Sequence, residues 1–185
     1  MLFSAAVNAQ TFPGTEPGTD IGGSLAGGYE PSGLAYNATT DKLWTVHDGG
    51  SVTRMDTDGT NLTNWSVTGD LEGITIANES SNFVYLGVEH ADAIIEYNFV
   101  TSTVVRTFDL TTWMTGPDNS GLEALTFVPI AGHAEGGLFY AGLQDTGEVF
   151  IFSLPIVSSA VSTTVTFVDS FQPVPGRTDL SGLFY

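Results

Sequence analysis

Hydrophobic and polar residues alternate in short runs along most of the chain from about residue 34 onward. The pattern is clearest at residues 93–97 and 148–152, where apolar side chains recur at every second position. A period of two is typical of strands with one buried face. β-Branched and aromatic residues fill the runs, and Asp-Gly and Gly-Gly pairs separate them. No segment keeps a sustained helical period, so the pattern predicts an all-β fold.

A related tetrapeptide opens each group of strands. Its copies are Pro31-Ser32-Gly33-Leu34, Leu71-Glu72-Gly73-Ile74, Leu122-Glu123-Ala124-Leu125 and Leu180-Ser181-Gly182-Leu183. The Gly or Ala positions lie 40, 51 and 58 residues apart. After each of the first three copies we expect three more strands, the second at 42–46, 83–88 and 138–143 and the fourth at 62–67, 104–110 and 163–168. Four short strands in about 40–50 residues are the signature of a β-propeller blade.

The repeats therefore predict a β-propeller of four-stranded antiparallel blades. We place the blades at about residues 29–69, 70–115 and 119–171, with the first strand of a fourth at 178–185. Because propellers have typically 4–8 blades, we expect a part of a larger ring, or an arc whose end a partner covers. The alternative is a β-sandwich with coincidental repeats, but a sandwich needs no common tetrapeptide.

Residues 1–28 precede the repeats as an N-terminal segment. A short apolar run within residues 2–7 leads to Val7-Asn8-Ala9, which is like a signal-peptidase site. We therefore expect export, to an extracellular or periplasmic location. The basic start and long apolar stretch of a complete signal are missing, so a disordered N-terminus is the alternative. No later window approaches the ~20 apolar residues of a membrane span, so we expect no membrane insertion.

The charge balance excludes one class of partner. The chain has 4 Lys and Arg against 21 Asp and Glu, for a formal net charge of −17. Polyanions are bound through Lys and Arg, so a nucleic acid would be repelled. The chain has no Cys, which removes disulfides, thiol nucleophiles and Cys-type zinc sites.

Acidic residues recur where strands begin and end. In an antiparallel meander, the start of the first strand lies beside the end of the second, so both belong to one face of the propeller. We expect Glu72 and Glu123 to converge near the central axis as metal ligands. Asp48, Glu89 and Gln144, at the ends of the second strands, are further candidates. Calcium is the expected ion because it prefers oxygen ligands. Alternatively, these residues cap strand ends and bind backbone amides.

Two of the three histidines, His47 and His90, are expected on the same acidic face. Each is a candidate general base or metal ligand, because carboxylates favour the protonated imidazole. His133 is expected in a turn on the opposite face. The sequence has no Gly-x-Ser-x-Gly elbow and no phosphate-binding glycine loop, so neither a serine hydrolase triad nor nucleotide binding is indicated.

Three stretches carry a family resemblance, namely residues 30–36, 42–48 and 70–74. They resemble the SdiA-regulated family of bacterial propellers and the related esterase-like phytase propellers, and more distantly the calcium-dependent lactonase and paraoxonase propellers. The resemblance implies six blades and calcium at the channel mouth, with a poorly defined activity in the closest group. Ala124 and Gln144 depart from the repeat, since they stand where the other copies have Gly and an acid.

These observations lead to three functional hypotheses. The first is a secreted calcium-binding propeller that serves as a recognition or assembly module, with a partner chain, the rest of the propeller or a small molecule at the acidic face. The second is a calcium-dependent hydrolase of phosphate esters or lactones, in which His47 or His90 moves protons. The third is that the acidity only keeps the protein soluble in salt.

Overall fold

The computed structural model describes residues 20–173, 178 and 180–185, and the signal-like residues 1–9 lie outside this range. The described residues form strands and one short 3₁₀ helix, η1 (Gly22–Ser24). The strands are β1 (Pro31–Asn37), β2 (Lys42–His47), β3 (Ser51–Asp56), β4 (Thr63–Ser66), β5 (Leu71–Thr75), β6 (Phe83–Val88), β7 (Ala93–Asn98), β8 (Thr103–Asp109), β9 (Leu122–Pro129), β10 (Gly137–Leu143), β11 (Val149–Ser153) and β12 (Thr166–Phe171).

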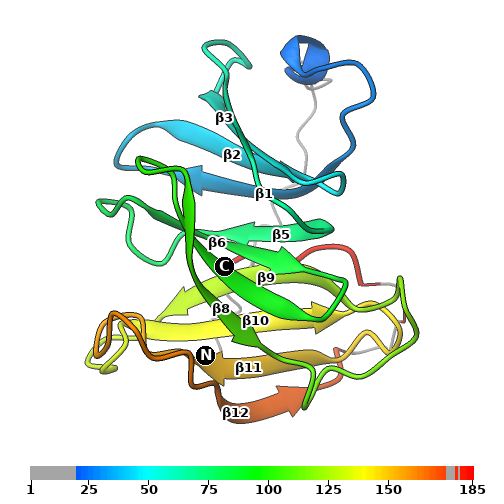
Figure 1. Ribbon diagram of the computed structural model, residues 1–185, viewed down its shortest axis with the longest axis vertical. Helices are drawn as coiled ribbons and strands as arrows, with labels where there is room; N and C mark the ends of the chain where they lie inside the picture. Colours follow the sequence, from blue (N-terminus) through cyan, green and yellow to red (C-terminus); the bar gives the residue numbers. More distant parts are fainter. Residues whose placement is uncertain (1–19, 174–177, 179) are drawn as a thin grey trace, which may run out of the picture.

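The strands form three four-stranded antiparallel sheets, in each of which spatial order follows chain order. We call β1–β4, β5–β8 and β9–β12 blades 1, 2 and 3, and Figure 1 shows them stacked one upon another. Each sheet falls within one of the predicted units, which confirms the predicted grouping of strands. The described residues also include no helix long and apolar enough to cross a bilayer.

The first strands of the three blades, β1, β5 and β9, lie beside one another along the inside of the arc. Small residues of the repeated tetrapeptide allow this approach. A Cβ on Gly33 would lie 3.0 Å from the Cα of Gly73, and one on Gly73 would lie 2.7 Å from the Cβ of Leu125. Because both positions meet a neighbouring strand, the tetrapeptide brings the innermost strands together.

Two apolar clusters between the blades make up the core. Side chains of blades 1 and 2 form one cluster, in which Trp44 stacks on Trp65 with ring centroids 5.5 Å apart. Blades 2 and 3 share the other, which includes edge-to-face pairs of Phe139 with Tyr85 and with Phe127. Each blade therefore buries its apolar face against the next, as the period of two requires.

The outermost strand of blade 3 lies three residues later than predicted, at Thr166–Phe171 instead of 163–168. Arg106, on β8, explains the difference. Its guanidinium is buried against Glu96, with Nε 2.6 Å from a carboxylate oxygen. The same group donates to the carbonyls of Pro155, Ser159 and Ser162 at 2.7–3.1 Å. These bonds hold residues 155–162 in a loop, so the strand begins only after it.

The C-terminal residues continue the repeat by their position in space. The Leu180 side chain occupies the space that a Cβ on Gly142 would need. One blade earlier, the Leu122 side chain occupies the corresponding space beside Gly87. Residues 180–185 themselves are not hydrogen-bonded as a strand. The expected start of a fourth blade is thus present as a packed segment along the inside of blade 3.

Candidate functional site

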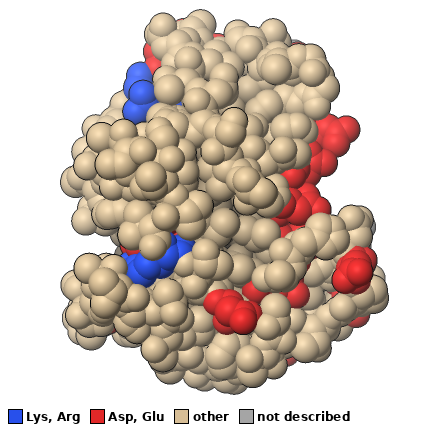
Figure 2. All heavy atoms as spheres, viewed as in Figure 1, with Lys and Arg blue, Asp and Glu red and all other residues tan. Residues whose placement is uncertain are grey.

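Carboxylates from the first and second strands meet at one end of the blades, where the chain enters β5 and leaves β6. The register pairs Leu71 with Val88, and the backbone N–H of Glu89 donates to the carbonyl of Asp70 at 3.0 Å. Acidic side chains gather along one side of the surface in Figure 2, and basic ones appear on the other. We call the set Asp70, Glu72, Glu89, His90 and Glu123 the acidic mouth.

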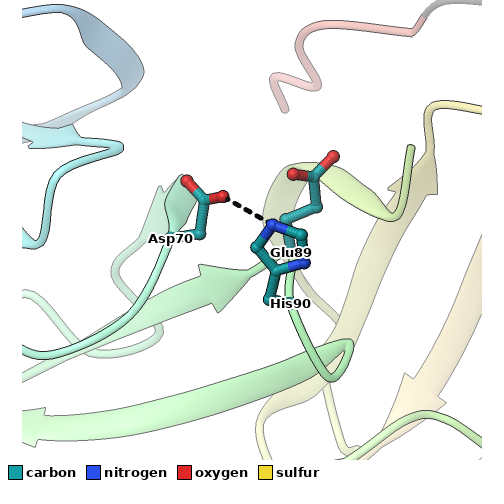
Figure 3. A group of neighbouring side chains, drawn as sticks. All are labelled: Asp70, Glu89 and His90. Carbon is teal, nitrogen blue, oxygen red and sulfur yellow. Dashed lines mark ion pairs between the residues drawn. The ribbon is translucent and has the colours of Figure 1, made fainter. Parts of the chain in front are cut away.

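Asp70, Glu89 and His90 form the tightest group within the mouth (Figure 3). Each offers one ligand atom, and these atoms all lie within 4.8 Å of one another. Asp70 points toward the imidazole of His90, with Oδ2 3.2 Å from Nε2. The His90 side chain is half exposed, whereas Glu89 is buried. The group is therefore open to solvent on the histidine side.

Glu72 and Glu123 lie close enough to interact. Burial and the nearby charge of Glu123 raise the pKa of Glu72 to about 7. The Asp70 carboxyl, which also interacts with Glu72, contributes to the increase, and the Ser32 hydroxyl opposes it. Asp70 therefore connects the Glu72–Glu123 pair with the Glu89 and His90 side chains.

Glu72 and Glu123 both line a cavity of about 720 Å³ on the inner face of the arc. Residues of β1, β5 and β9 form its wall, together with residues 20–25 before the first blade and residues 181–184 after the last. Sequence reasoning missed the contribution of residues 20–25, because nothing in their composition distinguishes them from the rest of the N-terminal segment. It also did not identify Asp70 as the link between the carboxylates.

Glu89 has a structural contact as well as a place in the mouth. One of its carboxylate oxygens accepts the backbone N–H of Gly121 at 3.2 Å, and Asp92 accepts that of Leu122 at 2.7 Å. Both acids thus hold the start of β9 against blade 2. Burial raises the pKa of each, and the backbone hydrogen bonds oppose the increase. The alternative interpretation, in which acids bind backbone amides at blade junctions, describes this contact of Glu89.

The second-strand candidates of blades 1 and 3 have other neighbours. Asp48 contacts His47, with Oδ1 2.6 Å from Nδ1, and the ring of Tyr29 stacks on that imidazole. In blade 3, the backbone N–H of Gln144 donates to the carbonyl of Gly121 at 2.8 Å. Neither Asp48 nor Gln144 belongs to the group formed by Asp70, Glu89 and His90. His133 lies in the turn between β9 and β10, as expected.

The donor set of the mouth fits a cation. Carboxylate oxygens from Asp70, Glu72 and Glu123 are ligands that hard divalent ions prefer. The basic side chains that the structure describes are engaged elsewhere, Lys42 with Asp56, Arg54 over two tryptophan rings and Arg106 with Glu96. These three basic side chains therefore belong to other groups than the acidic mouth.

Comparison with known proteins agrees with the fold. A family model described as SdiA-regulated matches residues 24–133. No curated protein matches the chain. The β-propeller domain of Myceliophteria thermophila Cps50 (Swd1) is 11% identical, with a TM-score of 0.52, over 82% of this chain and 41% of that one. U3-55K is 10% identical, with a TM-score of 0.50, over 79% of this chain and 40% of that one. The chain thus spans about two fifths of these structures, and it has the fold of a β-propeller.

Proposed function

This chain belongs to the SdiA-regulated family, and on that premise we propose that it is a propeller module that binds calcium at its acidic mouth. The ion would tie neighbouring blades together at the axis and prepare the mouth to recognise a ligand or a partner chain. This role needs no nucleophile and no complete catalytic set within these blades.

The observation that carries the proposal is the convergence of Glu72 and Glu123, which lie 51 residues apart in the sequence. Partial burial and the neighbouring charge of Glu123 raise the pKa of Glu72 to about 7. A divalent cation would relieve that repulsion. Asp70, beside Glu72, supplies further oxygen atoms.

Calcium suits this donor set better than a transition metal does. Glu72, Glu123 and Asp70 offer only oxygen, and water can fill the remaining positions of an ion that takes six to eight oxygen ligands. Glu89 is a further candidate ligand, although one of its oxygens already accepts the Gly121 N–H. Asp48 and Gln144 are weaker candidates, because their observed contacts lie within other groups.

Thermal unfolding with and without calcium tests the proposal. We expect millimolar calcium to raise the melting temperature of chelator-treated protein, because an ion at 100 times its Kd stabilises the folded state by about 2.7 kcal/mol. Glu72→Gln and Glu123→Gln should remove the increase. Asp169→Asn removes an exposed charge on β12 and should retain it. An unchanged melting temperature for the parent protein would exclude the ion.

A metal-assisted hydrolase is the second candidate, and His90 is the observation that favours it. Its imidazole is half exposed, pairs with Asp70 and belongs to the group that also contains Glu89. It could exchange protons with a phosphate ester or lactone held at the mouth. His47 is the less favoured proton carrier, because it contacts Asp48 and Tyr29 instead.

A panel of phosphate esters and lactones, assayed with calcium, tests this second candidate. Turnover that His90→Ala abolishes and His47→Ala leaves intact would support it. Full turnover in Glu72→Gln would remove the carboxylate pair from the reaction.

The proposed location outside the cytoplasm depends on residues 1–9 alone, and fractionation of cells expressing the full chain would test it.

A further inference from the structure

We propose that Asp70, Glu89 and His90 bind a transition metal ion of the Zn²⁺ type. The site is distinct from the calcium site proposed at the Glu72–Glu123 pair. Asp70 precedes β5, whereas Glu89 and His90 follow β6, so the antiparallel pair brings all three to one end of blade 2 (Figure 3). Their ligand atoms all lie within 4.8 Å of one another.

The donor set differs from that of the calcium site by one nitrogen atom. Imidazole nitrogen suits zinc and its first-row neighbours, whereas calcium takes oxygen ligands. Open zinc sites use three protein ligands and leave a fourth position to water. Asp70, Glu89 and His90 supply three ligands, and the half-exposed side chain of His90 leaves the group open to water.

Asp70 and His90 already have the spacing of two ligands of one ion. Asp70 Oδ2 lies 3.2 Å from His90 Nε2. Adjacent ligands of a tetrahedral zinc ion are roughly 3.3 Å apart, because each lies about 2.0–2.1 Å from the metal. An ion would therefore replace the proton between these two atoms without driving the side chains apart.

Glu89 gives an independent reason to expect a cation. The residue is only 6% exposed, and burial raises the pKa of its carboxyl. Among the described residues, only the Gly121 N–H donates a hydrogen bond to this carboxylate, and it reaches one of the two oxygens. A buried carboxylate is stabilised by hydrogen bonds or by a nearby positive charge. A metal ion would provide the charge that the single hydrogen bond does not.

The surroundings of the site are complete on both sides. Blade 2 lies between the other two blades, with β5 against both β1 and β9. The start of β9 covers Glu89, and the backbone N–H of Leu122 donates to Asp92 close by. The burial of Glu89 therefore arises from contacts between described blades.

The inference goes beyond the proposed function, because it assigns Glu89 and His90 to a second ion. It also makes His90 a metal ligand, which differs from the proton transfer considered for a hydrolase. Asp70 borders both sites, and the two oxygens of a carboxylate can serve two ions. The two proposals can fail separately, since melting with calcium tests the first and zinc binding in the presence of calcium tests the second.

Isothermal titration calorimetry of the full chain with Zn²⁺, in a buffer that contains millimolar calcium, tests the inference. We expect a single zinc site with a Kd in the micromolar range or below. Co²⁺ added in place of zinc should give the visible absorption of a four- or five-coordinate ion, which loosely held hydrated cobalt lacks.

Matched variants identify the ligands. Glu89→Gln keeps an oxygen for the Gly121 N–H, and His90→Ala shortens a half-exposed side chain, so both should fold. Each should weaken zinc binding at least about tenfold. The control is His133→Ala, in the turn between β9 and β10, which should change the Kd less than about twofold.

Glu72→Gln separates this site from the calcium site. It should alter the Kd for zinc by less than about threefold. A loss as large as that in His90→Ala would overturn the distinct site. Zinc binding that survives in both Glu89→Gln and His90→Ala, or a folded parent protein that binds no zinc, would also overturn the inference.

Discussion

Individual residues of the mouth differ in what their surroundings do to them. Glu72 is partly buried beside another carboxylate, so its pKa rises to about 7. Glu79, in a turn of blade 2, receives hydrogen bonds from the Thr39 side chain and backbone, and its pKa is lowered. Both are glutamates in an acidic protein, but only Glu72 has a local reason to take up a cation or a proton.

The raised pKa of Glu72 predicts a pH dependence in calcium-free protein. The folded chain holds this proton more tightly than the unfolded chain, whose glutamate titrates near 4.5. The stability that the protonated Glu72 carboxyl contributes at low pH should therefore decline as the pH rises from about 4.5 to about 7. Melting temperatures of the parent and Glu72→Gln, measured from pH 4 to 8, should show the parent losing stability relative to the variant. A constant difference would contradict the assignment, and calcium should reverse the trend at pH 8.

At the scale of elements, the blades depend on close approach of their first strands. β1 lies against β5 and β5 against β9, with glycine at the contact in the first two copies of the tetrapeptide. The third copy has Ala124, and the segment that follows it in space is the unpaired run 180–185.

This packing predicts unequal effects of one substitution at two equivalent positions. Gly73→Ala would place a Cβ 2.7 Å from the Cβ and 2.9 Å from the backbone nitrogen of Leu125. Because overpacking of this kind displaces backbone, we expect a loss of about 1–3 kcal/mol in the free energy of unfolding.

Gly182→Ala is the matched control, since a Cβ there meets nothing within 4 Å. Its effect should stay within about 0.5 kcal/mol. Urea denaturation of both variants measures the contrast. Equal losses would mean that the inner strands do not pack as described.

The whole molecule is dominated by one sign of charge. The net charge is −17, and the described basic side chains are engaged away from the mouth. Self-repulsion of this size opposes compaction, whichever site the acids serve. This repulsion acts on the molecule as a whole, whereas the acidic mouth concerns particular carboxylates.

Screening of this repulsion predicts a dependence on sodium chloride. Raising the salt from 20 mM to 0.5 M shortens the Debye length to a few ångströms, so we expect the melting temperature at pH 7.5 to rise by about 2–5 °C. The gain should shrink toward pH 4.1, the isoelectric point, where the net charge vanishes. Scanning calorimetry at both pH values checks this. A gain of the same size at both would exclude charge repulsion as its source.

The sequence by itself determined the strands, their grouping into blades and the face that carries Glu72 and Glu123. Side-chain alternation and turn chemistry act over a few residues, so these features could be inferred from local patterns. Only the tertiary structure decided that Asp70 joins Glu72 to His90, that Glu89 holds Gly121, and that residues 20–25 help to close the cavity. Each of these contacts depends on the distance and angle between separate segments, which the packing of whole blades determines and no local pattern records.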